Sequence, residues 1–429
     1  MTGKNTNYGE MANAIYKMKK YGTDILPPSI NTSDISFTPN ESDNTILFGL
    51  GGISGINVDI AKEIIDKRPF SSFKNFYENV NKDENTLIKH SKIIKLIKAG
   101  CFDEFGDRID IMNEYIKYKF IPKTTLTTSN LQQCINLGVS LPKDLVRVYN
   151  FKRYVLSKQF FYCKDPNFKS KKHYIVEEKF AKPYLTERYL DDLKEGKDYY
   201  YENDQMVIID KSLEKVLKPD LENLKATLND PKVIESYNHL AFEQLYKDSV
   251  KDDIHHPNVN AWSFDATSYY HYDAHELENI NYKEFNLSHF NELPEQPRFI
   301  ERHYGKRSWR QYDISKICGT VVDRDDNKHI VYLLTPDNNV VSVKFNGGQY
   351  SWYKQTISEI NSDGTKTILD PSWFTRGTLL MVVGYRNEDN FRAKRYKNTI
   401  FQHTVTKILD ANTYELQTER IGEDEELRN

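Results

Sequence analysis

The chain has 429 residues, a formal net charge of −3 and a mean hydropathy of −0.69. Its length predicts about three domains, and the absence of a long apolar run excludes a membrane span. The near-neutral charge excludes a globally basic nucleic-acid binder, so a role of that kind must depend on local patches. The four cysteines form no Cys-x-x-Cys pair and the N-terminus has no apolar signal core, so we expect a reducing, cytoplasmic location.

Residues 1–45 are expected to form a helix and an extended connector. A helix with a basic end is predicted over residues 11–20, closed by Tyr21-Gly22. Pro27-Pro28 forbids a helix and extends the chain, which then passes through a strand-like segment at 45–48.

A glycine-rich stretch from Gly49 to Gly55 runs directly into a segment with apolar residues at helical spacing. This pattern predicts a tight loop before a helix N-terminus, where unpaired N–H groups and partial positive charge favour a phosphate. The spacing Ile53-x-Gly55-Ile56-x-x-x-x-Ala61 resembles the hairpin of a helix-hairpin-helix unit, with Asn57 in place of the usual second glycine. Asparagine tolerates positive φ and is also a good helix N-cap. A structural turn without a ligand is the alternative. The candidate residues for duplex phosphate are Gly52, Ser54, Gly55, Ile56, Asn57 and Lys62.

Two further helices are predicted after this hairpin. Ser72 is expected to cap the first, and the second is predicted over residues 86–99 with Gly100 as its left-handed cap. Residues 46–118 are therefore interpreted as a tandem helix-hairpin-helix DNA-binding domain. Its charges nearly balance, so binding would depend on the hairpin amides plus a few of the lysines at 89, 92, 95 and 98, although a solvated helix face is expected for any single one of them.

The middle of the chain carries few signals. Residues 119–257 contain no motif or repeat, and we interpret them as a mostly helical insert of unknown role. Gln244-Leu245-Tyr246 is a faint candidate for a sliding-clamp peptide, so binding to a clamp stays open.

The connector 258–312 contains His271, His275 and Glu276, a pattern that would fit a metal-dependent nuclease. A metal site needs at least three convergent ligands and a second shell, which the sequence does not show. We therefore expect no metal site.

Residues 313–415 read as a β-domain. Five strand candidates are separated by Asp-Asn and Gly turns, with a longer excursion after the third: residues 317–322, 329–335, 340–345, 377–385 and 399–405. This order predicts an oligonucleotide-binding (OB) barrel and, for the chain, an α+β multidomain fold. Residues 416–429 are read as an acidic tail.

Cations beside aromatic rings in the loops of this barrel are what single-stranded nucleic acid requires. The candidates are Arg307, Trp309, Arg310, Tyr385, Phe391, Arg392, Lys394 and Arg395. Arg386 belongs to the same basic loops. A barrel whose basic loops are only solvated is the alternative.

Taken together, these segments resemble the C-terminal part of the bacterial DNA polymerase III alpha subunit, a family C DNA polymerase, from the end of the fingers onward. The resemblance covers about residues 10–118 and 258–410 and leaves the insert unexplained. Four landmarks carry it: Ile25-Leu26-Pro27-Pro28-x-x-Asn31, the hairpin from Phe48 to Ala61, Leu96-Ile97-Lys98-Ala99-Gly100-Cys101-Phe102-Asp103, and Phe264-Asp265-Ala266-Thr267-Ser268-Tyr269-Tyr270 with His275 and Leu277.

The resemblance implies a DNA-binding portion of a replicative polymerase, with the hairpins on duplex and the OB domain on single-stranded template. Polymerisation in that family uses three palm aspartates that hold two Mg²⁺ ions, and these have no counterpart here; Asp323-Arg324-Asp325 falls in a strand-turn-strand segment. We therefore expect no catalytic residue and no cofactor on this chain.

Catalysis is instead expected from a separate palm-bearing chain that binds Mg²⁺, as in a split gene, with this chain inactive alone. The setting would be a bacterial cell, or a host cell if a bacteriophage encodes the chain. An independent, non-catalytic DNA-binding protein for replication or repair is the alternative.

Overall fold

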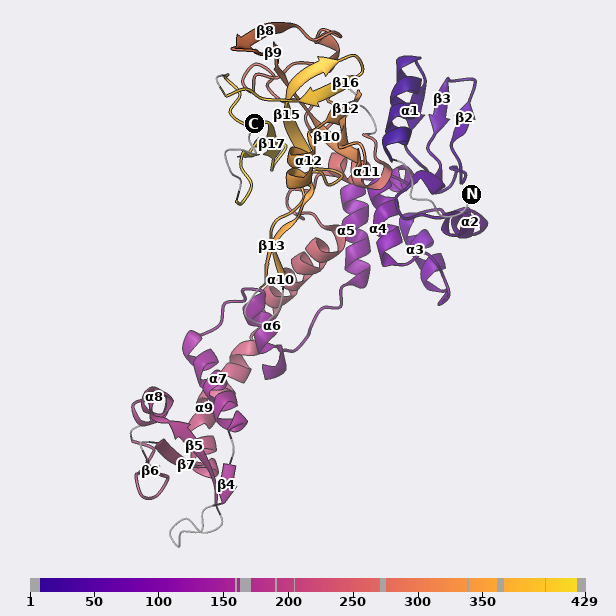
Figure 1. Ribbon diagram of the computed structural model, residues 1–429. Coiled ribbons are helices and arrows are strands. Elements are labelled where there is room, and N and C mark those ends of the chain that lie inside the picture. The colour runs from indigo at the N-terminus through magenta and orange to yellow at the C-terminus, as the bar shows by residue number, and fades with distance from the viewer. Residues whose placement is uncertain are drawn as a thin grey trace. The chain divides into compact units, whose positions relative to one another are not determined.

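The computed structural model describes residues 8–158, 160–162, 171–189, 191–203, 205–270, 275–337, 339–360, 366–397 and 399–422 (Figure 1). The chain divides into two compact units, Met1–Asn113 with His256–Asn429, and Glu114–His255. His271 and the acidic run Glu423-Asp424-Glu425-Glu426 lie outside the described residues.

The first unit begins with helix α1 (Tyr8–Lys20), which ends on Gly22 at a φ of +80° as the sequence predicts. A small sheet follows, in which β3 (Thr45–Leu47) lies between β1 (Asp24–Leu26) and β2 (Thr38–Asn40). The strand expected at 45–48 is confirmed.

The tandem helical domain comes next. Its elements are η1 (Leu50–Gly52), α2 (Val58–Asp66), α3 (Phe73–Asn81), α4 (His90–Ala99), η2 (Asp103–Phe105) and α5 (Arg108–Lys119). The expected caps form: the Asn57 and Ser72 side chains accept from the third helical amide, and Gly100 is left-handed at φ +89°. A side chain on Gly100 would collide with the guanidinium of Arg108, so the glycine is also required by packing.

Several residues of the motifs that carry the resemblance hold the helical domain together. The Asn31 side chain donates to the carbonyl of Phe70 and accepts from its amide, both at 2.8 Å, and thereby ties the extended connector to the turn before α3. Asp103 makes a 2.6 Å ion pair with Arg108, which also donates to Ser263.

A closed barrel of five strands forms most of the remaining unit. Each strand pairs with two neighbours in the ring β10-β11-β12-β16-β15, in which β12 and β16 are parallel and the other pairs antiparallel. The strands are β10 (Ser315–Asp325), β11 (Ile330–Leu334), β12 (Val340–Lys344), β15 (Leu379–Asn387) and β16 (Asn390–Ala393). Alternating apolar residues such as Val331, Leu333, Val341 and Val343 fill the interior. This arrangement confirms the predicted OB-type barrel and the α+β class.

The fifth barrel strand was predicted wrongly. It is β16 rather than residues 399–405, because Glu388 adopts a φ of +56° and turns the chain directly back after β15. Residues 399–404 lie outside strands, and β17 (Val405–Ile408) instead pairs with β15 and with β18 (Leu416–Gln417).

The barrel carries further elements. The excursion after the third barrel strand contains α12 (Gly347–Lys354) and a hairpin of β13 (Ile357–Ile360) and β14 (Lys366–Asp370). The segment before the first barrel strand contains α11 (Val259–Thr267), η6 (Phe290–Glu292) and a hairpin of β8 (Phe299–Tyr304) and β9 (Arg307–Tyr312). On the barrel's outside, Ala12 of α1 and Phe264 of α11 pack with Val322 and Leu334.

The second unit combines helices with a sheet that the sequence did not predict. Its helices are η3 (Thr128–Asn130), α6 (Leu131–Asn136), α7 (Lys143–Ser157), α8 (Glu178–Ala181), the π-helical η4 (Lys182–Thr186), α9 (Asp210–Leu228) and α10 (Pro231–Val250). The sheet has the order β4-β5-β7-β6, with β4 (Phe160–Tyr162), β5 (Lys172–Glu177), β6 (Tyr199–Glu202) and β7 (Gln205–Ile209). These strands are three to six residues long, too short to stand out in a Lys/Glu-rich sequence.

No helix among the described residues is long and apolar enough to cross a membrane.

Candidate nucleic-acid interface

The first hairpin is a tight turn held by its own backbone. The Ile56 amide donates to the Ile53 carbonyl at 3.0 Å, and Gly55 sits at the third position of this turn with a φ of +79°. The chain then enters α2, where the Asn57 side chain accepts from the Ile60 amide at 2.9 Å. Asn57 therefore acts as a helix cap in place of a second hairpin glycine.

Four of the five residues from Gly55 to Asp59 present unpaired amides around this cap. Among the described residues, the N–H groups of Gly55, Asn57, Val58 and Asp59 donate to no other group. Gly55, Asn57 and Lys62 are also exposed. Backbone amides at a helix N-terminus, beside a glycine without a side chain, are the donors that a phosphate oxygen requires.

The other predicted hairpin residues have structural roles. The Ser54 amide donates to the Ala266 carbonyl of α11 at 2.7 Å, so it is not available to a ligand. Ile56 is buried, and a side chain on Gly52 would lie 2.7 Å from the Phe48 ring. The amides of Ser54 and Ile56 are therefore already used within the fold, and Gly52 is required by packing. Phosphate binding by these three residues stays a prediction.

One cation near the hairpin was missed from the sequence. The ammonium of Lys92, on α4, lies 3.2 Å from where a Cβ of Gly55 would stand. Lys92 is half-buried, whereas the sequence predicted a solvated helix face for it. Lys92 is far from Gly55 in the sequence, and only the fold brings α4 against the turn. No local sequence pattern could therefore have shown this contact.

In the corresponding loop of the second helix-hairpin-helix unit, residues 82–89, most amides donate within the protein. The Asn85 amide donates to the Asp83 side chain, the Leu87 amide to Glu63 at 2.8 Å, and the Ile88 amide to Thr86 at 3.1 Å. The Thr86 and Lys89 amides donate to carbonyls within the loop. Every amide from Asn85 to Lys89 is thus hydrogen-bonded inside the protein.

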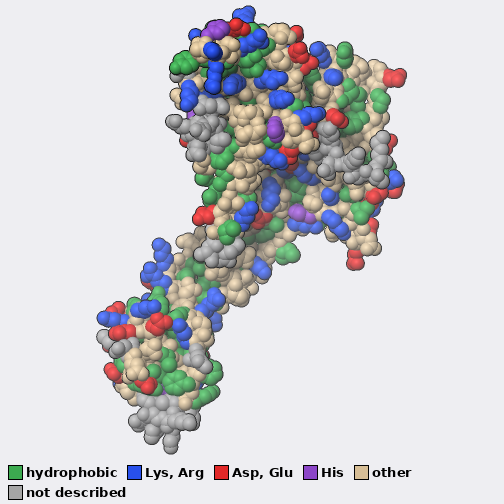
Figure 2. All heavy atoms as spheres, in the orientation of Figure 1, with side chains coloured by type: hydrophobic (Ala, Val, Ile, Leu, Met, Phe, Trp, Pro, Cys, Tyr) green, Lys and Arg blue, Asp and Glu red, His purple; other side chains and the backbone are tan. Residues whose placement is uncertain are grey.

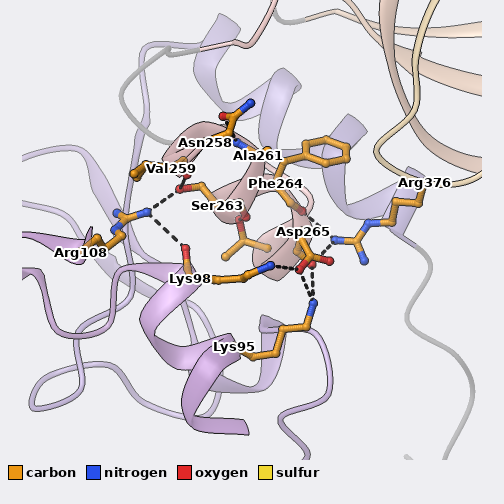
Figure 3. A network of polar contacts seen from close by, with 11 residues as sticks. Lys95, Lys98, Arg108, Asn258, Val259, Ala261, Ser263, Phe264, Asp265 and Arg376 are labelled. Atoms are coloured by element: carbon orange, nitrogen blue, oxygen red, sulfur yellow. Dashed lines mark hydrogen bonds and ion pairs between the residues drawn. The ribbon is translucent and has the colours of Figure 1, made fainter. Parts of the chain in front are cut away.

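A polar network next to the first hairpin connects α4, α11 and the loop before β15 (Figure 3). Lys95 and Lys98 of α4 reach Asp265 of α11 at 2.6 and 3.2 Å. Arg376, from the loop before β15, donates to the carbonyls of Phe264 and Asp265 at 2.8 and 3.1 Å. Since Ser54 bonds the next carbonyl, the C-terminal end of α11 joins the hairpin, α4 and the barrel.

Two titratable groups in this network have shifted pKa values. Burial alone would raise the pKa of Asp265, but hydrogen bonds and charges from Lys95 and Lys98 outweigh it and hold the pKa below its usual value. Burial lowers the pKa of Lys95, and Asp265 only partly offsets this effect. The two lysines therefore serve the fold and are not solvated cations.

The β8–β9 hairpin carries three of the residues predicted for the single strand. Its strands pair Arg302 with Trp309 and Glu301 with Arg310, so Trp309 and Arg310 point to opposite faces. The Arg310 guanidinium lies 4.4 Å above the Phe299 ring and 3.9 Å from Glu301. Arg307 is exposed on the same face as Trp309. The structure thus brings Arg307 and Trp309 together and separates Arg310 from them.

The remaining predicted residues lie on or after the last two barrel strands. Arg392 and Lys394 are exposed, and Arg395 is half-buried. Tyr385 is half-buried and stacks on Tyr312 at 4.3 Å, which occupies one face of its ring. Phe391 is fully buried in the barrel core, so its expected stacking on a base is wrong.

Arg386 is likewise a structural residue. It donates to the carbonyls of Leu293 and Glu388 at 3.0 and 2.8 Å and lies over the Phe290 ring at 4.7 Å. These contacts fasten the segment before β8 to β15 and β16, so its expected place among solvent-exposed basic residues is wrong.

Two other candidates are also explained by the fold. His275 is buried: its Nδ1 accepts from the Leu277 amide and its Nε2 donates to the Leu334 carbonyl, while burial lowers its pKa to about 4. Asp325 accepts from the Asn327 and Lys328 amides in a turn. Tyr246 is fully buried in α10 whereas Gln244 is exposed, so clamp binding through this faint candidate stays open. No cluster of three His, Cys, Asp or Glu suited to a metal ion occurs among the described residues.

The hairpin, the second helical unit and the barrel together define a region like the C-terminal part of a DNA polymerase III alpha subunit. Residues 22–110 match the helix-hairpin-helix motif family. Over 407 residues, 94% of its length, the chain is 34% identical to "Probable DNA polymerase YorL" of Bacillus subtilis and to "DNA-directed DNA polymerase" of Bacillus phage SPbeta. The chain spans 30% of the length of each of these relatives.

A shorter match is with a polymerase III alpha subunit. Over 103 residues, 24% of the chain and 9% of the relative, it is 41% identical to DNA polymerase III subunit alpha of Aquifex aeolicus. The resemblance inferred from the motifs is therefore confirmed.

Proposed function

We propose that this chain is a DNA-binding region of a replicative, polymerase III alpha-like DNA polymerase. The first hairpin holds duplex DNA through its phosphates, and the barrel with its β8–β9 hairpin holds the single-stranded template. The observation that carries the proposal is the set of unpaired amides at Gly55, Asn57, Val58 and Asp59 beside Lys92, within a segment that matches the helix-hairpin-helix family. Amides and a lysine that contact phosphate alone give affinity without reading sequence.

Catalysis, with its Mg²⁺ ions, belongs in this proposal to a palm-bearing chain. In support, the Asp325 side chain accepts two turn amides and lies 3.4 Å from Lys328, so it does not form a pair of open carboxylates with Asp323. The relative from Bacillus phage SPbeta supports a phage setting.

Fluorescence anisotropy with the full chain tests the binding half of the proposal. Duplexes of unrelated sequence should bind equally well, with affinity falling steeply between about 50 and 200 mM salt as counterions are released. Equal failure to bind duplex and single-stranded DNA at low salt would contradict the proposal.

Co-purification from the native cell tests the catalytic half. A palm-bearing polypeptide should accompany this chain, and the chain alone should not extend a primer with Mg²⁺ and deoxynucleotides. Extension that persists after contaminating polymerases are removed would contradict a separate catalytic chain.

A further inference from the structure

The surface that OB barrels commonly offer to nucleic acid is unfavourable here. Oligonucleotides usually lie across the second and third strands, between the loop after the first strand and the loop joining the last two. In this barrel those strands are β11 and β12, and Tyr332 and Val340 on them pack against Ala12 of α1 and its neighbours. Part of the usual surface is therefore covered by the protein itself.

One of the two loops that border this surface is acidic. The β15–β16 turn contains Glu388 and Asp389, which are exposed and have no paired cation among the described residues. In the β10–β11 loop the carboxylates are balanced instead, since Asp325 pairs with Lys328 at 3.4 Å and Asp326 with Lys354 at 2.8 Å. Carboxylates on one side repel a polyanion, and the cations on the other side are already engaged.

The β8–β9 hairpin presents the opposite chemistry. Its two-residue turn, Gly305-Lys306, sets a register that puts six side chains on one face, which we call the outer hairpin face: Ile300, Arg302, Tyr304, Arg307, Trp309 and Gln311. This face contains two arginines and no carboxylate. Tyr304 is 81% exposed and Trp309 is 49% exposed. Basic side chains gather over this end of the molecule in Figure 2.

The rings and cations of the outer hairpin face alternate. Trp309 stands opposite Arg302, and Tyr304 stands opposite Arg307. Arg302 is held in place by a 2.9 Å hydrogen bond to the Gln311 side chain. The Arg302–Trp309 pair and the Tyr304–Arg307 pair are two residues apart, about 6.8 Å along the strands. Successive bases of an extended single strand can therefore stack on successive rings while its phosphates contact the arginines.

The other face of the hairpin fixes it to the barrel. Tyr312 stacks on Tyr385, and its amide donates to the Tyr396 hydroxyl at 3.0 Å. Arg392 and Lys394 are exposed near this anchor, since Arg392 pairs with Tyr385 across β15–β16 and Lys394 lies 5.7 Å from the Tyr396 ring. The rings of the outer face are not needed for these contacts.

We propose that the outer hairpin face, and not the β11–β12 surface, is the single-stranded DNA site of this chain. Bases stack on Trp309 and Tyr304, Arg302 and Arg307 bind the phosphates, and Arg392 and Lys394 extend the cationic path from the hairpin base. This inference rests on the proposed function, because it says where that function's single strand lies.

Binding of the full chain to an oligothymidine of about 12 nucleotides tests the site. The variant Tyr304→Ala with Trp309→Ala should lose at least about tenfold in single-strand affinity, and its duplex affinity should stay within about twofold. The matched control, His303→Ala with Ser308→Ala, changes the opposite face of the same hairpin and should bind both forms like the wild type.

Tryptophan fluorescence gives a second, direct readout. Of the four tryptophans, Trp309 is the exposed one, because Trp262 and Trp373 are buried and Trp352 is half-buried. Single-stranded DNA should quench wild-type emission. Trp309→Phe keeps a stacking ring, so it should retain affinity within about threefold and lose the quenching.

Two results separate the inference from the proposed function. If the ring variant binds the oligothymidine like the wild type while Lys344→Ala on β12 weakens binding, the single strand lies on the usual barrel surface and the inference fails alone. If the wild type binds neither the oligothymidine nor duplex DNA, the proposed function fails and the inference with it.

Discussion

The two loops of the tandem helical domain have the same place in their helix-hairpin-helix units, but their backbone amides are used differently. In the first, Gly55 and the start of α2 leave amides without partners, and Lys92 adds a cation. In the second, Asp83, Glu63 and Thr86 accept from the amides of Asn85, Leu87 and Ile88, which lie before the cap of α4. A repeated fold therefore does not imply a repeated site, since what decides it is where each backbone N–H group donates.

The largest effect expected from this comparison is at Gly55. A β-branched residue at a φ of +79° is strained by roughly 1–3 kcal/mol, so Gly55→Val should either shift the amides or destabilise the turn. We expect duplex affinity to fall by about tenfold or more, measured by anisotropy. Gly55→Asn separates the two causes: asparagine tolerates the positive φ but still adds a Cβ beside Lys92, so it should lose less affinity than Gly55→Val. Equal, undiminished binding by both variants would show that the first hairpin is only structural.

The second loop should respond in stability and not in binding. Glu63 accepts from Lys67, Thr86 and Leu87, so Glu63→Gln should cost about 1–3 kcal/mol of local stability. Hydrogen exchange of the Leu87 and Ile88 amides should accelerate while duplex affinity stays unchanged. Glu78→Gln, which removes an exposed and longer ion pair to Lys74, is the control and should change neither.

The stabilisation that Glu63 gives to the second loop should depend on pH. Burial would raise the pKa of Glu63, but hydrogen bonds from Lys67, Thr86 and Leu87 lower it overall below the usual 4.5. The folded protein thus favours the ionised form, so the stabilisation is complete above the unfolded pKa and disappears as the pH falls below it. The difference between wild type and Glu63→Gln should therefore narrow below about pH 4.5. A difference that persists unchanged in acid would contradict the role of the Glu63 charge.

Features that depend on residues close together in the sequence were predicted correctly. Asn57, Ser72 and Gly100 were predicted correctly because capping depends on residues within one turn. The barrel was recognised from strand runs and turn residues, but β16 was missed because it contains only two apolar residues, Phe391 and Ala393, in four positions.

What the sequence could not predict depends on distant contacts. Ser54 lost its predicted role to a carbonyl of α11, which follows it by more than 200 residues. Lys92 and Lys95 look alike on one predicted helix, but the fold sends Lys95 to Asp265 and Lys92 to Gly55. Such assignments need the packing of α4 against both α11 and the hairpin.

Lys92→Ala tests the cation that distinguishes the two loops. Loss of one phosphate contact should weaken duplex binding by a few-fold at moderate salt and reduce the slope of log affinity against log salt by about one unit. Lys74→Ala removes an equal charge from an exposed position on α3 and serves as the control. A control that weakens binding as much as Lys92→Ala would mean that overall charge, and not the hairpin, determines affinity.

The smallest effect is expected at Asp59, the one carboxylate in the first turn of α2. Its charge stabilises the helix N-terminus by about 0.3–1 kcal/mol but repels a phosphate bound at the same amides. Asp59→Asn should therefore bind duplex about twofold more tightly at low salt, and the gain should vanish at high salt as the charges are screened. Asp66→Asn makes the same change at the other end of α2, where it should leave binding unchanged. If Asp59→Asn weakens binding, or if Asp66→Asn strengthens it equally, phosphate does not sit at the N-terminus of α2.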